Sequence, residues 1–496
     1  MIENHLSLLL VVLPLLAAPI VAVLPNGRLP WAVSTLVSWS VFYLAAWQLM
    51  NVSTGNVISY ELGGWAPPWG IEYRIDAANA LVALIVSGIA ALTLPYALKS
   101  VIKEIPQQQH ALFYAAFMLC LTGLLGIAQT GDIFNLFVFL EISSLSSYAL
   151  ISLGKKRQAL TAAYQYLIMG TIGATFFIIG VGLLYAMTGT LNMADLAQRL
   201  PELYEHRTIH TAFAFIMVGF ALKLALFPLH VWLPNAYTYA PTVVTVFLAA
   251  TATKVAVYVM LRMVFTVFSF TFIESTPADE LFLLLCVMGI LGMSFYAIYQ
   301  KDSKRLLAYS SVAQIGYMML GIGLGSVLGA TATLVHLFNH ALMKGALFMA
   351  IGALVYRVGS SRLEHFSGLG KQMPWTFAAI VIGGLSLIGV PGTAGFISKW
   401  YLVLAAIEQQ NWLIVGVILI GSLLAVIYVW KMVEVLYFKA TDEMEQHNTA
   451  VKEAPLMMLI PMWVLVLANV YFGFNTELTV GTAQQAVQLL IPGVNK

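Results

Sequence analysis

Hydrophobic runs of about 18 residues or more recur along almost the whole chain, with short polar segments between them. A run of this length spans the hydrocarbon core of a bilayer as one helix. We interpret the first run as a membrane helix rather than a signal peptide, because no basic segment precedes it and many further runs follow. The pattern predicts fourteen membrane helices near residues 6–24, 31–51, 78–98, 112–130, 133–153, 161–187, 209–240, 242–265, 280–299, 304–324, 328–357, 375–408, 411–437 and 455–474.

The composition agrees with a bilayer as the main solvent. Of the 496 residues, 60% are hydrophobic and 9% are charged, whereas about 25% of residues are charged in soluble domains. A net charge of +2 gives no indication of a nucleic-acid partner. Cys120 and Cys286 lie in apolar runs, which excludes a disulfide scaffold and a cysteine-ligated metal cluster. A phosphate-binding loop of the Walker type is also absent from the sequence, so we expect an all-α integral membrane protein without a cofactor.

The basic residues of the connecting loops predict the orientation of the helices. If the N-terminus lies outside, the inner loops hold 14 of the 24 basic residues and the outer segments hold 5. This separation follows the positive-inside rule and predicts both termini outside the plasma (inner) membrane of the cell. The inner residues are Arg28, Lys99, Lys103, Lys155, Lys156, Arg157, Lys301, Lys304, Arg305, Arg357, Arg362, Lys371, Lys439 and Lys452, and the outer ones are Arg74, Arg199, Arg207, Arg262 and Lys496.

The five remaining basic residues are lysines inside predicted helices. Lys431 lies near an inner helix end, from which its ammonium group can reach the interface. Near a helix centre a lysine costs about 2.5–3.5 kcal/mol on insertion scales, so it normally faces the bundle interior or a wet cavity. Burial and a nearby carboxylate act in opposite directions on an ammonium group, so a lysine between them can exchange a proton near neutral pH. The lysines that require such an explanation are Lys223, Lys254, Lys344 and Lys399.

Glu141, inside the fifth predicted helix, is the expected carboxylate partner of Lys223. Together they form a candidate proton-transfer pair. The alternative is a permanent ion pair that only holds two helices together.

Two predicted helices contain interruptions. In the seventh, Pro228 and Pro234 are six residues apart on either side of His230, a possible accessory group, and should break the helix. In the twelfth, Pro391 and Gly392 form a break that lies shortly before Lys399. Broken helices are tolerated at membrane depth where they line a cavity, and corresponding breaks in two halves indicate an ion site. Two ordinary proline kinks are the alternative.

The positions of the breaks predict an internal repeat. Helices four to eight and nine to thirteen each number five, and the interrupted helix is the fourth in both groups. Because five is odd, the two repeats must run through the membrane in opposite directions, as in many transporters. The predicted units are residues 1–108 with the first three helices, the repeats 109–265 and 278–437, and residues 438–496 with the last helix.

A polar stripe runs along the eleventh predicted helix. Spacing of four residues places His336, His340 and Lys344 on one face. Histidine titrates near neutral pH and suits a relay between lysines, and Lys254 could continue this line between the repeats. Zinc binding is less consistent with the sequence, since no Glu follows His336 and no third ligand is evident, so no metal is expected. Either histidine could also be a hydrogen-bonded core residue.

Together these residues resemble the antiporter-like subunits shared by respiratory complex I, membrane-bound hydrogenases and Mrp-type multisubunit cation/proton antiporters. The resemblance covers the chain from about the second to the thirteenth helix. It implies fourteen helices with two inverted five-helix repeats. It further implies that Glu141 and Lys223 form a coupling pair, that Lys254 and the histidines of the eleventh helix connect the halves, and that Lys399 is the outlet to the outer side.

Within that family, segments 131–137, 227–234 and 253–258 look most like the Mrp D type. Asn235 departs from the pattern, since the family usually has Asp there. The resemblance implies a secondary transporter subunit rather than an enzyme, which moves protons in a sodium/proton antiporter with other membrane subunits as partners. The alternative is a proton-pumping, non-redox subunit of complex I or of a related hydrogenase. A stand-alone transporter of an organic solute is a third possibility.

Overall fold

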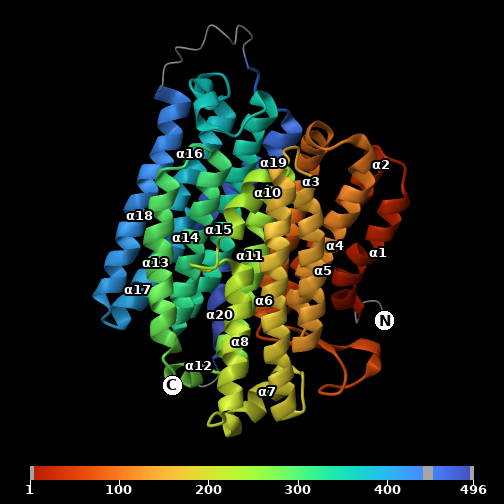
Figure 1. Cartoon of the computed structure of the whole chain (residues 1–496), viewed down its shortest axis with the longest axis vertical. Helices are drawn as coiled ribbons and strands as arrows, with labels where there is room; N and C mark the ends of the chain where they lie inside the picture. The colour runs from red at the N-terminus through yellow and green to blue at the C-terminus, as the bar shows by residue number, and fades with distance from the viewer. Residues whose placement is uncertain (1–4, 439–450, 492–496) are drawn as a thin grey trace.

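The computed structural model describes residues 5–438 and 451–491, which are almost entirely helical (Figure 1). The first helices are α1 (Leu6–Val23), α2 (Arg28–Val52), α3 (Ala77–Glu104), α4 (His110–Gln129), α5 (Ile133–Ser152), α6 (Gln158–Thr188), α7 (Met193–Arg199), α8 (Arg207–Leu224), α9 (Trp232–Tyr239), α10 (Thr242–Ala250) and α11 (Ala252–Arg262). The others are α12 (Phe270–Glu274), α13 (Ala278–Ile298), α14 (Ser303–Gly323), α15 (Val327–Val358), α16 (Pro374–Ile388), α17 (Ala394–Glu408), α18 (Trp412–Val433), α19 (Leu456–Phe474) and α20 (Thr482–Leu490).

Short turns and one hairpin complete the described chain. Strands β1 (Ile58–Glu61) and β2 (Glu72–Ile75) pair antiparallel, with Ile58 opposite Ile75. Turns of 3₁₀ type cover Leu62–Gly64, Gln107–Gln109, Leu200–Leu203, Leu363–Phe366 and Leu369–Lys371. Turns of π type cover Met263–Val267, Glu434–Phe438 and Glu477–Gly481.

Thirteen helical segments of the described chain are long and apolar enough to cross a membrane. The remaining predicted span is divided into α16 and α17, which have 15 residues each and continue one another across a short break. The fourteen predicted helices are therefore present, with boundaries that differ from the prediction by a few residues. Apolar runs of this length leave little choice of fold, because only a helix satisfies its own backbone hydrogen bonds in lipid.

The second helix of each repeat begins in the same way. Asp132 caps α5 by accepting a hydrogen bond from the Asn135 amide (2.7 Å), and Asp302 caps α14 by accepting one from the Arg305 amide (3.1 Å). Each aspartate also forms an isolated antiparallel β-bridge with the segment that follows the third helix of its repeat: Asp132 with Asn192, and Asp302 with Arg362. The two caps lie at opposite ends of the bundle, since Asp132 adjoins β2 and Asp302 adjoins the loop after α15. The repeats are therefore inverted relative to each other.

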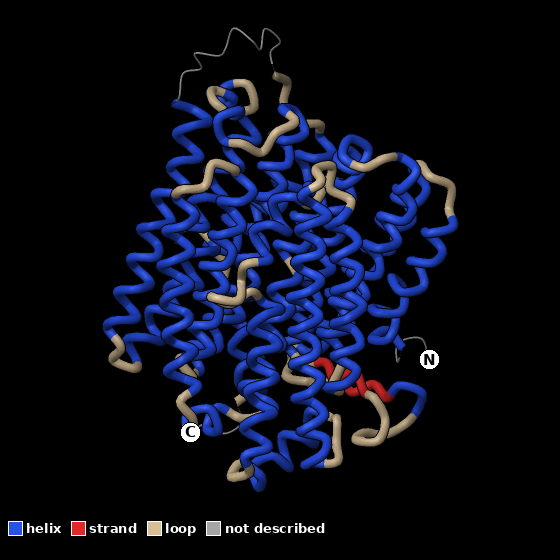
Figure 2. Tube along the Cα trace, in the orientation of Figure 1, coloured by secondary structure: helices blue, strands red, loops and turns tan. Residues whose placement is uncertain are grey.

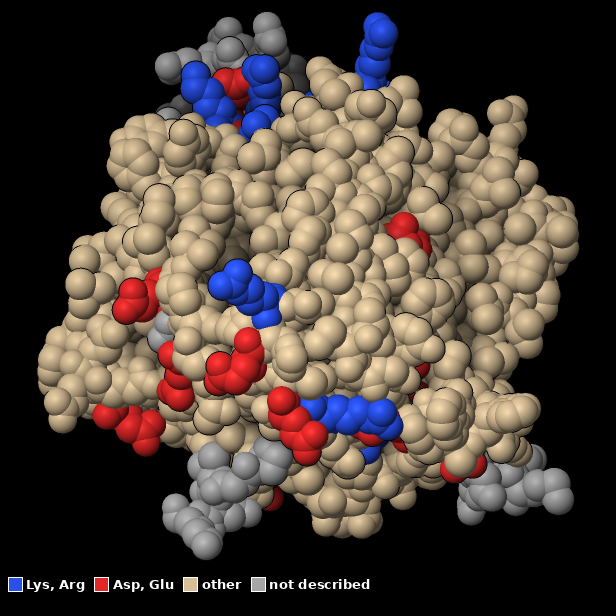
Figure 3. Space-filling view, turned by 60° about the horizontal axis from the view of Figure 1, so that its bottom comes forward, with Lys and Arg blue, Asp and Glu red and all other residues tan. Residues whose placement is uncertain are grey.

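The bundle has two ends, which we call upper and lower as in Figure 1. The hairpin lies at the lower end, and loop segments interrupt the helices at mid-height (Figure 2). Acidic side chains are spread over the lower end (Figure 3). His5 is hydrogen-bonded to Tyr60 of β1 (2.7 Å), and Leu490 of α20 lines a cavity with Arg74 of β2. Both described ends of the chain thus lie at the lower end, as an even number of spans requires.

Helix α15 lies between the two repeats and organises the interior. It packs against α14, α16 and α17 of its own repeat, and also against α10, α3, α19 and α20. The α10–α11 segment is almost completely enclosed. Of the basic residues used to predict orientation, Lys439 and Lys496 lie outside the described residues, as do parts of the predicted unit 438–496.

Candidate functional site

Lys223, near the C-terminal end of α8, lies beside Glu141 of α5. Its Nζ is 3.4 Å from Oε1 of Glu141 and donates a hydrogen bond to Oγ of Ser144 at 2.8 Å. The Lys223 side chain is 6% exposed, whereas that of Glu141 is 24% exposed. The ammonium group is thus enclosed in the bundle, and the carboxylate reaches its surface. The structure places the two predicted partners together and adds a serine hydroxyl as the nearer acceptor.

Residues 225–231 separate α8 from α9. Ala225 has the left-handed φ of 61° that ends α8, and Pro228 lies within the break. Pro234 has a different place from the one predicted: it lies in the first turn of α9, where a missing N–H removes no helical hydrogen bond. His230 is buried in the same break between aromatic rings. Pro228 therefore lies within the interruption, and Pro234 lies in the first turn of the helix that follows it.

Residues 389–393 interrupt the twelfth span in a similar way. Gly389 ends α16 with a left-handed φ of 90°, and Pro391 and Gly392 follow within the break. A helix end at membrane depth leaves backbone carbonyls without helical partners, and another group must donate to them instead.

Lys399 of α17 supplies this group. Its Nζ donates hydrogen bonds to the carbonyls of Leu387 (3.2 Å) and Ile388 (2.9 Å) at the end of α16, and to Oγ of Ser422 in α18 (3.0 Å). It also lies 4.8 Å from the centre of the Tyr317 ring. The negative end of a helix dipole and an aromatic face both stabilise a positive charge. Within residues 5–438 and 451–491, Lys399 forms no ion pair with a carboxylate.

The polar face of α15 is buried between α14 and α17. Nδ1 of His336 is hydrogen-bonded to Oγ of Ser398 (2.8 Å), and the rings of His336 and His340 stack with centres 5.8 Å apart. Neither ring nitrogen of His340 has a hydrogen-bond partner in the described part of the chain. Lys344 donates a hydrogen bond to the hydroxyl of Ser310 in α14. The three predicted residues therefore form one continuous stripe inside the protein.

Lys254 lies at a third helix break, which the sequence does not reveal. Thr251, with φ −124° and ψ −60°, separates α10 from α11. The fully buried Nζ of Lys254 donates to the carbonyl of Ala249, which this break leaves without a helical partner. Helices α10 and α11, which meet beside Lys254, both pack against α15. Lys254 is thus brought to the α15 stripe, between the two repeats as predicted.

A small cavity of about 40 Å³ extends from Lys223 toward α11, the helix of Lys254. Its volume suffices for a water molecule, which needs about 10–15 Å³ of such space and polar partners. Its polar lining consists of Ser143, Ser144, Ser147, Tyr166 and Lys223. The cavity gives the Lys223 pair a hydratable connection toward the centre of the protein.

No group of three His, Cys, Asp or Glu side chains among the described residues is placed to hold a metal ion. His336 is hydrogen-bonded to Ser398, which directly precedes Lys399, and Lys344 follows His340 by one helical turn. The side chains of Lys254, His336, His340, Lys344 and Lys399 are all nitrogen bases. Each can carry or release one proton, so this arrangement suits proton exchange.

A family model described as "NADH:quinone oxidoreductase/Mrp antiporter, TM" matches residues 130–427. This range contains Glu141, Lys223, Lys254, the polar stripe of α15 and Lys399. The chain belongs to this family. It is 41% identical to the N subunit of the NADH-quinone oxidoreductase of Desulforudis audaxviator, over 98% of this chain and 99% of the relative. It is 30% identical to the D subunit of the Na(+)/H(+) antiporter of Alkalihalophilus pseudofirmus, over 99% of this chain and 98% of the relative.

Two solved structures share the fold of this chain. A chain of the membrane-bound sulfane sulfur reductase, an archaeal respiratory membrane complex, has a TM-score of 0.90 at 32% identity, with 98% of both chains covered. A chain of the Mrp complex from Dietzia sp. has a TM-score of 0.90 at 25% identity, with 99% of this chain and 98% of that chain covered. The family and fold are therefore as predicted. Segments 131–137, 227–234 and 253–258 do not identify the chain as an Mrp D-type subunit. The chain shares more identity with the NADH-quinone oxidoreductase relative than with the antiporter relative.

Several polar groups of this antiporter-family site escape prediction from sequence. Ser144, Ser310, Ser398 and Ser422 each contact a buried lysine or histidine. Serines are common in membrane helices, and only the packing of neighbouring helices shows which of them face a lysine. Asn235, the departure from the family pattern, donates to Oε1 of Gln165 in α6 (2.8 Å) and so holds α9 against that helix.

Proposed function

We propose that this chain translocates protons through a line of buried groups, as one subunit of a multisubunit ion-translocating membrane complex. The line begins at Glu141 and Lys223, continues through Lys254 to Lys344, His340 and His336, and leaves at Lys399. The observation that carries the proposal is the kind of partner these lysines have. Three of them donate to backbone carbonyls, three donate to serine hydroxyls, and only Lys223 lies beside a carboxylate.

Neutral partners favour proton exchange over a structural role. An ion pair that only holds helices together needs a matching carboxylate, because a buried charge without compensation is costly. A lysine whose partners are carbonyls and hydroxyls can release its proton without leaving a bare carboxylate behind. The same partners accept a hydrogen bond from either the ammonium or the amine. Lys254, Lys344 and Lys399 thus have surroundings suited to two protonation states.

The exposed part of Glu141 supports the presence of partner subunits. Its carboxyl group lies in the middle of α5 and reaches the side of the bundle that would otherwise face lipid. A carboxylate on a lipid-facing surface is expensive, and such groups normally face protein or a wet cavity. We propose that another membrane subunit covers α5 there. The predicted units 109–265 and 278–437 then act as two half-channels, one at each broken helix.

Two energy sources remain as candidates. Exchange of protons against sodium follows the likeness to the D subunit of the Na(+)/H(+) antiporter. Redox-driven pumping follows the higher identity to the NADH-quinone oxidoreductase relative and the likeness to the sulfane sulfur reductase complex. In either case we propose a plasma-membrane protein with its upper end inside and both termini outside, as the loop charges indicate.

Purification of the native complex tests these proposals. If the chain is a subunit, it will co-purify either with small antiporter subunits or with quinone and iron–sulfur subunits, and each set identifies its energy source. Vesicles with the intact complex should acidify or alkalinise in response to a sodium gradient in the first case, or to an electron donor in the second. Vesicles with this chain alone should do neither. Active transport of an organic solute by the chain alone would disprove the proposal.

A further inference from the structure

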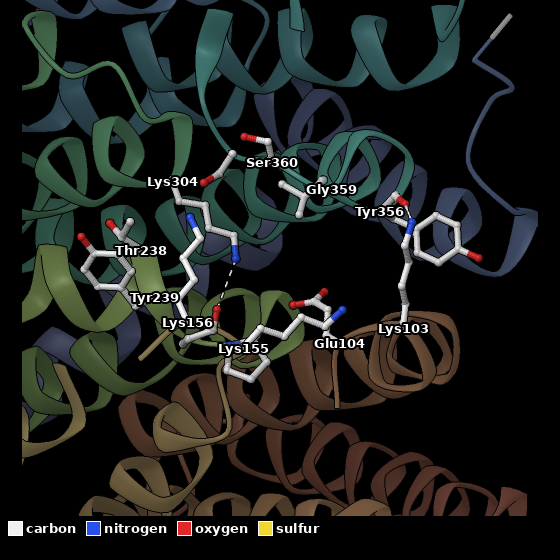
Figure 4. A pocket seen from close by; sticks show the side chains of 14 residues that line it. Lys103, Glu104, Lys155, Lys156, Thr238, Tyr239, Lys304, Tyr356, Gly359 and Ser360 are labelled. Carbon is white, nitrogen blue, oxygen red and sulfur yellow. Dashed lines mark hydrogen bonds between the residues drawn. The ribbon is translucent and has the colours of Figure 1, made fainter. Parts of the chain in front are cut away.

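A pocket of about 130 Å³ opens at the upper end of the bundle, at the junction of the two repeats (Figure 4). Its walls come from the end of α3, the α5–α6 loop, the α9–α10 junction, the start of α14, and the last turn of α15 with the segment after it. None of these segments contributes to the proton line. The pocket is bordered by Lys103, Lys155, Lys156 and Lys304, with Glu104 as its one acidic residue.

The single carboxylate is already engaged. Glu104 accepts hydrogen bonds from the Ser100 hydroxyl (2.7 Å) and from the amide of Thr242 at the start of α10 (2.7 Å). Among the described residues it forms no ion pair with any of the four lysines. The pocket therefore has an excess of three positive charges over negative ones, arranged around a space between helices.

The four lysines differ in how firmly they are held. Lys304 is 5% exposed and donates to the carbonyl of Ala240 (3.3 Å), and Lys103 donates to the carbonyl of Tyr356. Lys103, Lys155 and Lys156 are all exposed, and the side chains of Lys155 and Lys156 make no hydrogen bond or ion pair within residues 5–438 and 451–491. Figure 4 shows Lys156 directed toward Lys304 across the opening. The ammonium groups of Lys304 and Lys103 are therefore each held by a backbone carbonyl, whereas those of Lys155 and Lys156 have no partner among the described residues and can turn toward a ligand.

We propose that this pocket binds a phosphate group, carried by an anionic phospholipid headgroup or by free phosphate. A tetrahedral oxyanion offers several acceptors, and each lysine has three N–H donors, of which the protein uses at most one or two here. The volume of about 130 Å³ leaves room for one phosphate group, since a single water needs only about 10–15 Å³ of such space. Basic pockets between membrane helices near the headgroup level are suited to anionic lipids. Such a ligand would bridge the two repeats and stabilise their contact.

The test uses the full-length chain in neutral detergent and measures its thermal unfolding midpoint against added phosphatidylglycerol, phosphatidylcholine or inorganic phosphate. A ligand that binds the folded protein raises this midpoint in a dose-dependent way. We expect phosphatidylglycerol or inorganic phosphate to raise it, and phosphatidylcholine to have little effect. If both phosphatidylglycerol and inorganic phosphate raise the midpoint, free phosphate is sufficient for binding. If only phosphatidylglycerol raises it, the pocket binds the phosphate group of the lipid headgroup.

The double variant Lys155→Gln/Lys156→Gln should raise the half-effective concentration at least about tenfold, and Lys155→Arg/Lys156→Arg should restore it. The matched control is Lys371→Gln/Lys452→Gln, which removes two exposed charges from the same end outside the pocket. Equal weakening in both Gln variants would overturn the proposal, since only general surface charge would then be at work. The absence of any effect of phosphatidylglycerol and phosphate on the unvaried chain would overturn it as well.

Discussion

His336 of α15 is hydrogen-bonded through Nδ1 to the hydroxyl of Ser398, 2.8 Å away on α17. Ser398 immediately precedes Lys399, so this one contact joins the histidine stripe to the lysine at the second helix break. A hydroxyl both donates and accepts hydrogen bonds, and it can therefore relay a proton between a ring nitrogen and a neighbouring group. The contact makes the α15 stripe and the Lys399 site parts of one polar system.

Replacement of Ser398 by alanine should slow proton transfer without preventing assembly. The loss of one net hydrogen bond is worth about 0.5–1.5 kcal/mol, which corresponds to about a two- to tenfold effect. The measurement is the rate of proton movement in vesicles that contain the whole complex. Ser87→Ala in α3 is the matched control, because this buried serine donates only to carbonyls of its own helix. If both variants retain the full rate, Ser398 is a packing residue.

Lys223→Ala and Glu141→Ala should each reduce ion-driven proton movement by at least about a hundredfold, the scale of a lost acid–base group. The complex should still assemble, which gel filtration of the purified variants checks. Lys431→Ala provides the comparison: its Nζ donates to the carbonyls of Ile298 (2.7 Å) and Gln300 (2.9 Å) near a helix end, away from the proposed line. Normal transport in the Lys223 or Glu141 variant would disprove their role.

The helical fold can be predicted from the sequence because the bilayer imposes it. Apolar runs fix the helices, and loop charges separate the two ends. The pairing of Lys223 with Glu141 was also accessible, since a mid-membrane carboxylate and a mid-membrane lysine have few other partners.

The break at Thr251 is not predictable from the sequence, because neither proline nor glycine marks it. The sequence predicts Lys304 at the start of the helix 304–324 and counts it with the inner-loop charges, yet its side chain is buried, since tertiary packing decides how far a helix end lies inside the protein. The role of Pro234 was misjudged for a related reason. A proline is equally compatible with a break and with the first turn of a new helix, and the sequence alone does not separate them.

The cavity beside Lys223 allows a test that leaves every titratable group in place. Ala256 of α11 lines this cavity of about 40 Å³, and Ala256→Leu should fill it and exclude water between Lys223 and the centre. We expect about a tenfold slower proton transfer, which corresponds to about 1.4 kcal/mol at the barrier. Ala256→Ser adds a small polar group and should preserve the rate. Equal rates in the Leu and Ser variants would show that protons do not pass through this cavity.

The two main helix breaks use the same backbone device with different residues. Ala225 ends α8 with φ 61° and ψ 45°, and Gly389 ends α16 with φ 90° and ψ 46°. A residue with a side chain loses about 1–2 kcal/mol in this left-handed region, and glycine does not. A Cβ at position 389 would also lie 2.9 Å from Cδ of Lys399, a flexible side chain that can shift.

Gly389→Ala should therefore lower the free energy of unfolding by about 1–2 kcal/mol and move Lys399 away from the carbonyls at the end of α16. Ala225→Gly should raise the free energy of unfolding by about 0–1.5 kcal/mol, because the relief of about 1–2 kcal/mol of strain is only partly offset by about 0.5–1 kcal/mol of additional chain entropy in the unfolded state. The control is Gly182→Ala in the middle of α6, where an added Cβ meets no atom within 4 Å and alanine should stabilise the helix by up to about 1 kcal/mol. Thermal unfolding of the three variants gives their order of stability, and proton movement should fall only for Gly389→Ala.

A Gly389→Ala variant as stable as the unvaried chain would mean that α16 can end without the left-handed residue. The break would then depend on Pro391 and on Lys399 instead.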